Sequence, residues 1–235
     1  MTIGKTGIIP SFLIILILFS GCATEKAVNN SKEMNLFVET EAKITIKPEQ
    51  IELSQDEKLD LEADVLINSM SIDEKIGQLF ILSVRNSFDG TRMLYADDYM
   101  KHIIETYKPG GIILFAINFA NPSQTRNLIS DTQALSKIPL FMAVDEEGGK
   151  VARLGNTDRM SVTKLPPAAL IGRTGNTEYA KIASHVISEE LKAYGFNMNM
   201  APVADVNTNI QNPVIGNRTY SSDPYKAGLM VAAVT

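Results

Sequence analysis

Residues 139–153 read Pro-Leu-Phe-Met-Ala-Val-Asp-Glu-Glu-Gly-Gly-Lys-Val-Ala-Arg, an apolar run followed directly by three acids, two glycines and two cations. Residues 140–144 have the length and composition of a strand that is buried on both faces, as in a parallel sheet. Such a strand would deliver the carboxylates of residues 145–147 to one rim of the sheet, where two glycines let a ligand approach the backbone. A solvated acidic turn, with Gly148 and Gly149 as the turn itself, is the alternative that this segment leaves open.

The first 22 residues have the pattern of a secretory signal. Lys5 precedes an apolar run at residues 8–19, which is too short to span a bilayer comfortably, and Ser20-Gly21-Cys22 follows. Cys22 is the only cysteine of the chain, so it forms no internal disulfide. The segment resembles a bacterial lipoprotein signal, which implies cleavage before Cys22, a lipid on that residue and a location on the cell-envelope membrane. An uncleaved signal anchor is the alternative.

The rest of the chain divides into a tether and one domain. Residues 23–54 are polar and charged with little periodicity, which is typical of a tether, and residues 55–235 amount to a single domain. The net charge of −5 and the absence of a Lys/Arg block argue against nucleic acid as a partner. Two histidines, far apart in sequence, offer little for a zinc site, and we expect no metal and no cofactor.

Strand and helix patterns alternate along this domain. Helical patterns occupy residues 55–70, 71–77, 93–107, 122–137, 177–194 and 223–235, and strand patterns occupy residues 78–84, 111–115, 140–144 and 196–200. Alternation of this kind predicts parallel strands joined by right-handed crossovers, an α/β fold. An open doubly wound sheet usually shows a Gly-rich turn after its first strand, which this sequence lacks. We therefore predict a (β/α)8 barrel, which needs about 250 residues, with only about its first four units present.

Polar side chains follow three of the predicted strands. Asn118, residues 145–147 and Asp205 all fall where a strand ends, the edge at which barrels carry their chemistry. Asp205 lies in a long loop rich in Asn, residues 199–224, that also holds Asn207 and Arg218, and loops of this length inside a compact domain are usually functional. Amide and carboxylate groups suit sugar hydroxyls, and Arg218 adds a planar fork of donors. The alternative for Asp205 and Asn207 is that they cap their own turns.

Taken together, these residues resemble the N-terminal part of a glycoside hydrolase family 3 domain, most closely the bacterial β-N-acetylhexosaminidases that act on N-acetylglucosamine. The resemblance runs from about residue 71 to residue 224 and is carried by five segments in order. They are Ser-Ile-Asp-Glu-Lys-Ile-Gly-Gln-Leu-Phe at 71–80, Gly-Gly-Ile-Ile-Leu-Phe at 110–115, Val-Asp-Glu-Glu-Gly-Gly-Lys-Val-Ala-Arg at 144–153, Ala-Pro-Val-Ala-Asp-Val at 201–206 and Pro-Val-Ile-Gly-Asn-Arg-Thr-Tyr at 213–220.

The resemblance assigns roles to four residues. Asp145 matches the aspartate that holds hydroxyls of the terminal sugar, Arg153 an arginine that reaches the same sugar, and Arg218 the arginine of the fourth-strand loop. Asp205 matches a position near the pocket that does not touch the sugar itself. Lys150 stands where many relatives have arginine and Asn217 where many have aspartate, and neither departure touches the binding residues.

The resemblance assigns no catalytic residue to this sequence. Relatives continue with a Lys-His-Phe-Pro-Gly-His-Gly segment, then a loop with a His-Asp acid/base pair and a nucleophilic aspartate near the seventh strand, and this sequence ends before all of them. His102 and His185 lie within predicted helices and are not substitutes. Glu146 and Glu147 point to opposite faces of an extended segment, so at most one faces a pocket and both are interpreted as rim or structural acids.

Three hypotheses follow for function. The first is a lipid-anchored hydrolase that releases terminal N-acetylglucosamine from cell-wall-type glycosides by a retaining mechanism and without a cofactor, with β-glucosidase or β-xylosidase activity as the variant within the family. The second is a non-catalytic sugar-binding lipoprotein. The third takes Asp145, Glu147 and Asp205 as oxygen ligands of a divalent metal.

Overall fold

The structure is a computed structural model that describes residues 53–235, which lie within one compact unit. The predicted signal segment, Cys22 and the tether up to residue 52 lie outside the described residues. Within residues 53–235, no helix is both long and apolar enough to cross a membrane.

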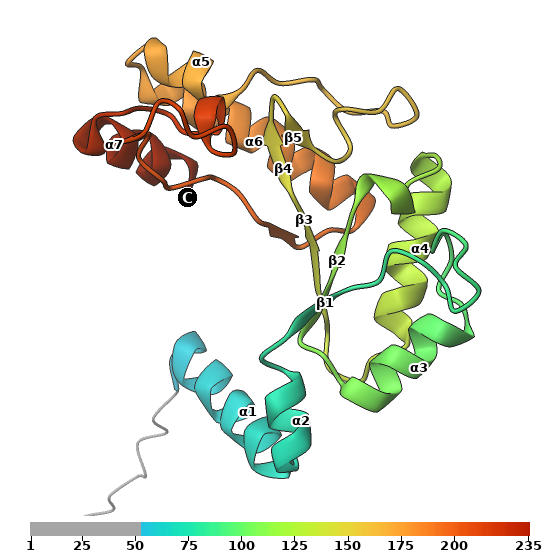
Figure 1. Cartoon of the computed structure of the whole chain (residues 1–235). Coiled ribbons are helices and arrows are strands. Elements are labelled where there is room, and N and C mark those ends of the chain that lie inside the picture. Colours follow the sequence, from blue (N-terminus) through green and yellow to red (C-terminus); the bar gives the residue numbers. More distant parts are fainter. Residues whose placement is uncertain (1–52) are drawn as a thin grey trace, which may run out of the picture. The chain divides into compact units, whose positions relative to one another are not determined.

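Four parallel strands form the central sheet (Figure 1). They are β1 (Ile81–Ser83), β2 (Gly111–Leu114), β3 (Phe141–Val144) and β6 (Met198–Asn199), paired in that order. Each strand pairs with the next parallel strand along the chain, as in a barrel, whereas a doubly wound sheet reverses its order partway. The α/β class and the parallel sheet are therefore confirmed, and the four strands form an open array.

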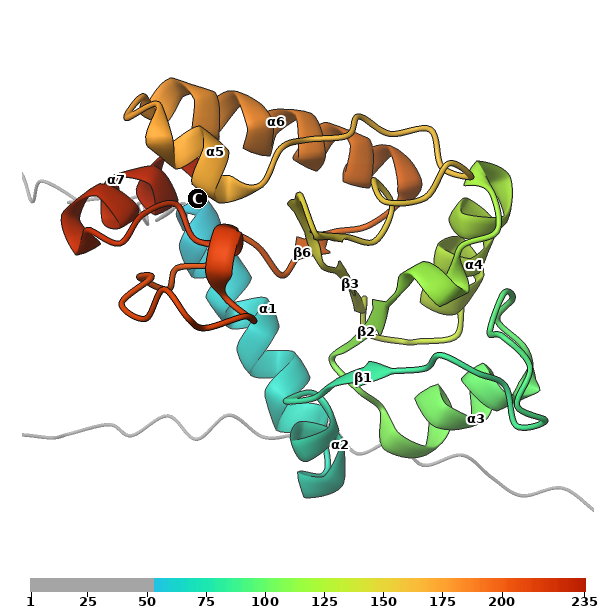
Figure 2. The ribbon, with the colours of Figure 1, turned by 45° about the horizontal axis from the view of Figure 1, so that its top comes forward.

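Helices fill the crossovers between these strands. They are α3 (Asp98–Tyr107), α4 (Pro122–Ala134) and α6 (Thr177–Tyr194), which follow one another around one side of the sheet (Figure 2). Alternate strand residues, among them Leu114 and Met142, are fully buried. They belong to one core with residues of the three helices: Met100, Ile104, Leu128, Ile129, Leu191 and Tyr194.

The opposite face of the sheet is less covered than the sequence predicted. The β3 side chain of Phe141 is 52% exposed, so the expectation that residues 140–144 are buried on both faces is wrong for this residue. Helix α1 (Gln55–Ser69) forms as predicted, with Ser54 and Glu57 in a capping box, but none of its residues is buried. Its predicted apolar stripe is therefore not packed within the described part of the chain.

Capping residues set most helix ends where the sequence placed them. Ser71 and Glu74 form the predicted capping box of α2 (Ile72–Gly77), and α6 ends at Gly195, whose φ of 97° is left-handed. Asp223 caps α7 (Pro224–Val234). The helix predicted over residues 93–107 begins only at Asp98, because the Asp97 carboxylate caps it there.

Some elements differ from the prediction in length, and several short ones were not predicted. The first strand is shorter than residues 78–84, because the amides of Leu79 and Phe80 still donate hydrogen bonds to carbonyls of α2. The unpredicted elements are β4 (Glu146–Gly148), β5 (Val151–Ala152), α5 (Ala168–Arg173) and the 3-10 turns η1 (Ala116–Asn118) and η2 (Gly216–Arg218).

Candidate functional site

The register of the sheet brings three side chains to the same edge. Ser83, Ile113 and Ala143 are paired across β1, β2 and β3, so the residues two positions later, Arg85, Phe115 and Asp145, point to the same face at the carboxyl ends of the strands. Asp145 thus lies at the predicted rim. Arg85 and Phe115 were not among the predicted site residues, although this spacing after each strand was readable in the sequence.

Asp145 is held by Arg153. The antiparallel hairpin of β4 and β5 turns the chain back, so that the Arg153 amide donates to the Asp145 carbonyl at 3.2 Å. The guanidinium donates to Oδ2 of Asp145 from Nη2 at 2.7 Å and from Nε at 3.2 Å. No hydrogen bond from residues 53–235 reaches Oδ1. This oxygen is available to accept a bond from a ligand hydroxyl.

Arg218 pairs with Glu147, 71 residues earlier in the chain. Its Nε and Nη2 donate to the two carboxylate oxygens at 2.9 and 2.7 Å, a bidentate fork, and Nη1 donates to the Val214 carbonyl at 3.3 Å. The hydrogen bonds to Glu147 raise the pKa of Arg218, and the charges of Asp145 and Asp205 add to that rise. Arg218 is therefore close enough to Asp145 and Asp205 to feel their negative charges. Its pairing with Glu147 was not predicted from the sequence.

Glu146 faces the other way, as the alternation of an extended segment predicts. Its buried carboxylate accepts the backbone amides of Leu154 and Gly155 at 2.8 and 2.9 Å. Its own backbone exchanges two hydrogen bonds of 3.0 Å with the Asn199 side chain on β6. Burial raises the pKa of this carboxyl. The contacts of Glu146 and Glu147 agree with the structural role predicted for both.

Two other expectations about the rim are corrected. Asn118 is fully buried, with its Nδ2 bonded to the carbonyls of Val84 and Met93 and its Oδ1 accepting the Phe115 amide, so it ties strand ends together and does not face a ligand. Gly148 and Gly149 have φ of 87° and 59° and form the hairpin turn. A Cβ on Gly149 would lie 2.6 Å from Pro167 Cβ. The group that packs closely against this glycine is therefore Pro167 of the same chain, and not a ligand as predicted.

The remaining candidates occupy ordinary positions. Asp205 is exposed, and its carbonyl accepts the Thr219 hydroxyl at 2.6 Å. His102 and His185 lie exposed on α3 and α6, as predicted. In the described range, no three Asp, Glu, His or Cys side chains come together in a way that could hold a metal ion, and the metal hypothesis for Asp145, Glu147 and Asp205 has no geometric support.

A cavity of about 520 Å³ lies away from this rim. Gln78, Lys108 and Ile138, which line it, all precede strands, so it adjoins the amino ends of the sheet. Barrel enzymes place their chemistry at the carboxyl ends, and we assign this cavity no function.

The sheet and the rim define an α/β protein whose parallel strands follow one another in the order of a barrel, with paired acids and arginines at their carboxyl ends. The model of the glycosyl hydrolase family 3 N terminal domain matches residues 71–235. The chain therefore belongs to glycosyl hydrolase family 3.

Two relatives agree with this membership. The chain is 39% identical over 131 residues to beta-hexosaminidase A of Pseudoalteromonas piscicida, covering 53% of this chain and 22% of that protein. It is 33% identical over 147 residues to a beta-hexosaminidase of Pseudomonas aeruginosa, covering 61% and 41%. The chain thus spans between about a fifth and two fifths of these relatives.

Solved structures confirm the fold. A family 3 beta-N-acetylglucosaminidase from Paenibacillus matches with a TM-score of 0.63 and 34% identity, covering 71% of this chain and 30% of that one. NagZ from Neisseria gonorrhoeae matches with a TM-score of 0.56 and 28% identity, covering 65% and 44%. The roles of Asp145, Arg153, Arg218 and Asp205 toward a sugar stay predictions.

Proposed function

We propose that this chain is the sugar-holding part of a β-N-acetylhexosaminidase that removes terminal N-acetylglucosamine from cell-wall-type glycosides. The family membership and the beta-hexosaminidase relatives support the reaction class. The observation that carries the proposal is the geometry of Asp145, whose Oδ2 is occupied by Arg153 while Oδ1 is open. A carboxylate fixed in this way accepts a sugar hydroxyl without reorganising.

The rim arginines would complete the sugar site. The guanidinium of Arg153 orients the Asp145 carboxylate, and Arg218 presents donors from the neighbouring loop. Charge-assisted bonds from both arginines suit the oxygen atoms of a hexosaminide.

Turnover needs groups other than these. In a retaining glycosidase a carboxylate attacks the anomeric carbon while a second group protonates the leaving oxygen, and these two groups lie about 5–5.5 Å apart. Glu146 and Glu147 are already committed to backbone amides and to Arg218. We infer that residues 53–235 alone hold sugar without hydrolysing it, and that the nucleophile and acid/base come from the segments that follow in relatives.

The test compares the 235-residue chain with a chimera that continues into the downstream part of the Paenibacillus relative. Release of chromophore from an aryl N-acetyl-β-glucosaminide is expected from the chimera and not from the chain alone. In the chimera, Asp145→Ala should lower kcat/KM about 100-fold or more, since bonds to sugar hydroxyls strengthen in the transition state. The exposed acid Asp158 provides the control, as Asp158→Ala should leave turnover unchanged.

Three results would contradict the proposal. Turnover by the chain alone above its Asp145→Ala variant would require catalytic groups among the described acids. Preference of the chimera for an aryl β-glucoside or β-xyloside would assign a different sugar. Sugar binding by a chimera without turnover would favour the sugar-binding lipoprotein.

We also propose that Cys22 carries a lipid that holds the protein on the bacterial cell-envelope membrane. The apolar run at residues 8–19 and the small residues before the single cysteine support this. Cys22→Ser should release the protein from the membrane fraction or block its processing, whereas Ser20→Ala, which keeps a small residue, should do neither. Unchanged fractionation and processing of Cys22→Ser would contradict the anchor.

A further inference from the structure

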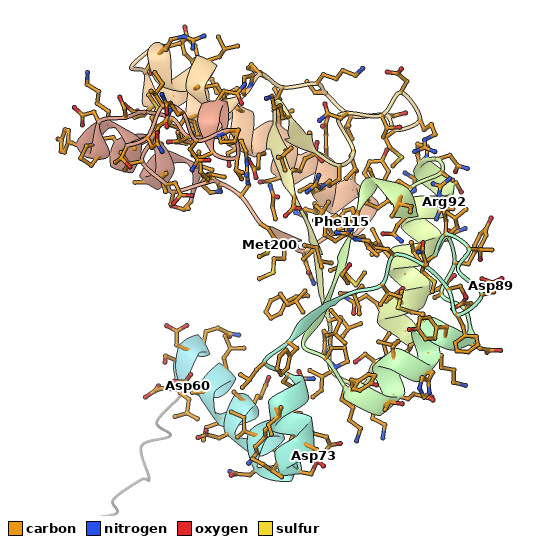
Figure 3. All side chains as sticks on the ribbon, viewed as in Figure 1. Asp60, Asp73, Asp89, Arg92, Phe115 and Met200 are labelled. Carbon is orange, nitrogen blue, oxygen red and sulfur yellow. The ribbon has the colours of Figure 1, made fainter. Side chains whose placement is uncertain are left out.

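Two arginines share one aromatic ring at the rim. Cζ of Arg85 lies 4.0 Å from the centroid of the Phe115 ring, and Cζ of Arg153 lies 5.3 Å from it. Both distances fall within the range of about 6 Å over which a guanidinium is attracted to an aromatic face. Figure 3 labels Phe115 at the carboxyl end of β2. The ring therefore stands between the end of β1, which supplies Arg85, and the hairpin that supplies Arg153.

Backbone contacts fix where this ring lies. Phe115 continues the extended conformation of β2, with φ of −125°, and its amide donates to Oδ1 of the buried Asn118 at 2.9 Å. The Nδ2 of the same Asn118 reaches the Met93 carbonyl and the carbonyl of Val84, the residue before Arg85. These contacts fix the backbone from which the Phe115 ring projects.

Arg153 needs such a support. Its two bonds to Asp145 both end on Oδ2, so they leave the guanidinium free to rotate about that single oxygen. Because a third of its side chain is open to solvent, burial does not prevent that rotation. Contact with an aromatic face restricts the plane of the guanidinium, and the plane decides which Asp145 oxygen is covered and which is open.

We propose that Phe115 is a positioning residue: its ring holds Arg153 in the orientation that keeps Oδ1 of Asp145 open to the sugar. The consequence for the sugar rests on the function proposed above, whereas the effect on Arg153 does not. Arg85 occupies the same ring and, within the described chain, forms no ion pair with an acid. Phe115 thereby contacts two guanidinium groups, and one of them, that of Arg153, is paired with Asp145.

The direct test follows the Nε–H of Arg153 by NMR in the 235-residue chain labelled with 15N-arginine, with Arg153→Lys to assign the signal. Phe115→Leu, which keeps apolar volume, should speed exchange of this proton with water about two- to fivefold, the factor expected for one cation–π contact at a partly exposed site. Phe115→Tyr keeps the aromatic face and should restore the original rate. Should Phe115→Leu fail to fold, Phe115→Met carries the same expectation.

A second cation–π contact in the chain serves as a control for a general increase in mobility. Arg126 lies 5.6 Å from the Tyr194 ring centroid, away from Phe115, and its Nε–H exchange should not change in Phe115→Leu. An unchanged Arg153 rate in Phe115→Leu, or equal acceleration of Arg126 and Arg153, would overturn the proposal and leave Phe115 as a packing residue.

The sugar consequence has a separate readout. In the chimera, Phe115→Leu should lower kcat/KM for the aryl N-acetyl-β-glucosaminide about two- to fivefold, and Phe115→Tyr should not. A chimera with no hexosaminidase activity would contradict the proposed function, while the exchange rates would still decide the positioning role. Faster Arg153 exchange without loss of kcat/KM would overturn the link to the sugar.

Discussion

Removal of the Glu147 carboxylate should destabilise the fold strongly, because it leaves the Arg218 guanidinium without its ion-pair partner. The Glu147 side chain is 7% exposed and that of Arg218 is 24% exposed, and two hydrogen bonds of 2.9 and 2.7 Å join them. The pair connects the β4 strand with the loop that precedes α7. Glu147→Ala leaves the guanidinium with only its 3.3 Å bond to the Val214 carbonyl and with limited access to water.

The expected magnitude follows from that burial. Breaking a buried ion pair by removing one partner costs about 3–5 kcal/mol, because an uncompensated charge stays in the interior. Arg218 keeps a quarter of its side chain in solvent, so water restores part of the loss, and we expect about 2–3 kcal/mol. With a urea dependence of about 2 kcal/mol per molar, the unfolding midpoint should fall by about 1–1.5 M.

The assay is urea unfolding of the 235-residue chain, followed by circular dichroism at low protein concentration. The control is the exposed pair of Lys164 and Asp158, whose side chains are 66% and 93% exposed, so that Asp158→Ala should cost less than about 1 kcal/mol. In the double variant Glu147→Ala/Arg218→Met the penalty should shrink, because no charge is left without a partner. A midpoint for Glu147→Ala no lower than that for Asp158→Ala would refute the reasoning.

Three further predictions concern stability. Burial raises the pKa of Glu146 above its ordinary 4.5, so the folded state holds this proton more tightly than the unfolded state. The protonated Glu146 carboxyl contributes fully to stability below about pH 4.5, and this contribution is lost as the pH rises through the folded pKa. Glu146→Gln should therefore flatten this part of a plot of the urea midpoint against pH. Parallel plots for the wild type and the variant would contradict the prediction. Asn118→Ala should cost about 2–4 kcal/mol in urea unfolding, since it leaves buried carbonyls and an amide without partners, and a loss under about 1 kcal/mol would be inconsistent with that role. Gly172→Ala should lower the midpoint because its Cβ would lie 1.9 Å from the Tyr220 carbonyl oxygen, whereas Gly228→Ala, with no atom within 4 Å, should be neutral or stabilising; equal midpoints would contradict the clash.

The site was predictable where it depends on strand ends. Residues 140–144 were predicted as a strand that delivers Asp145 to the rim, and β3 (Phe141–Val144) does so. The same parity places Arg85 and Phe115 at this rim, and neither was among the predicted site residues. Asn118 was assigned to the rim correctly by position, but its fully buried amide serves the backbone.

The main helices, the four strands of the sheet and their order were predictable from the amino-acid sequence alone. Capping residues such as Ser71, Asp223 and Gly195 act within one turn of the chain, and apolar periodicity acts within one element, so both are local and can be read without a fold. Five segments in order identified the family, and the matching domain model confirms it.

The pairing of charged groups follows from the tertiary structure. Glu147 and Arg218 are separated by 71 residues, and their contact depends on how the hairpin after β3 and the loop after β6 return to the same rim. The hairpin also turned Glu146 inward and brought Arg153 back to Asp145. Long-range pairing of this kind has no local signal, because it is fixed by packing and loop closure and not by the propensities of the residues involved.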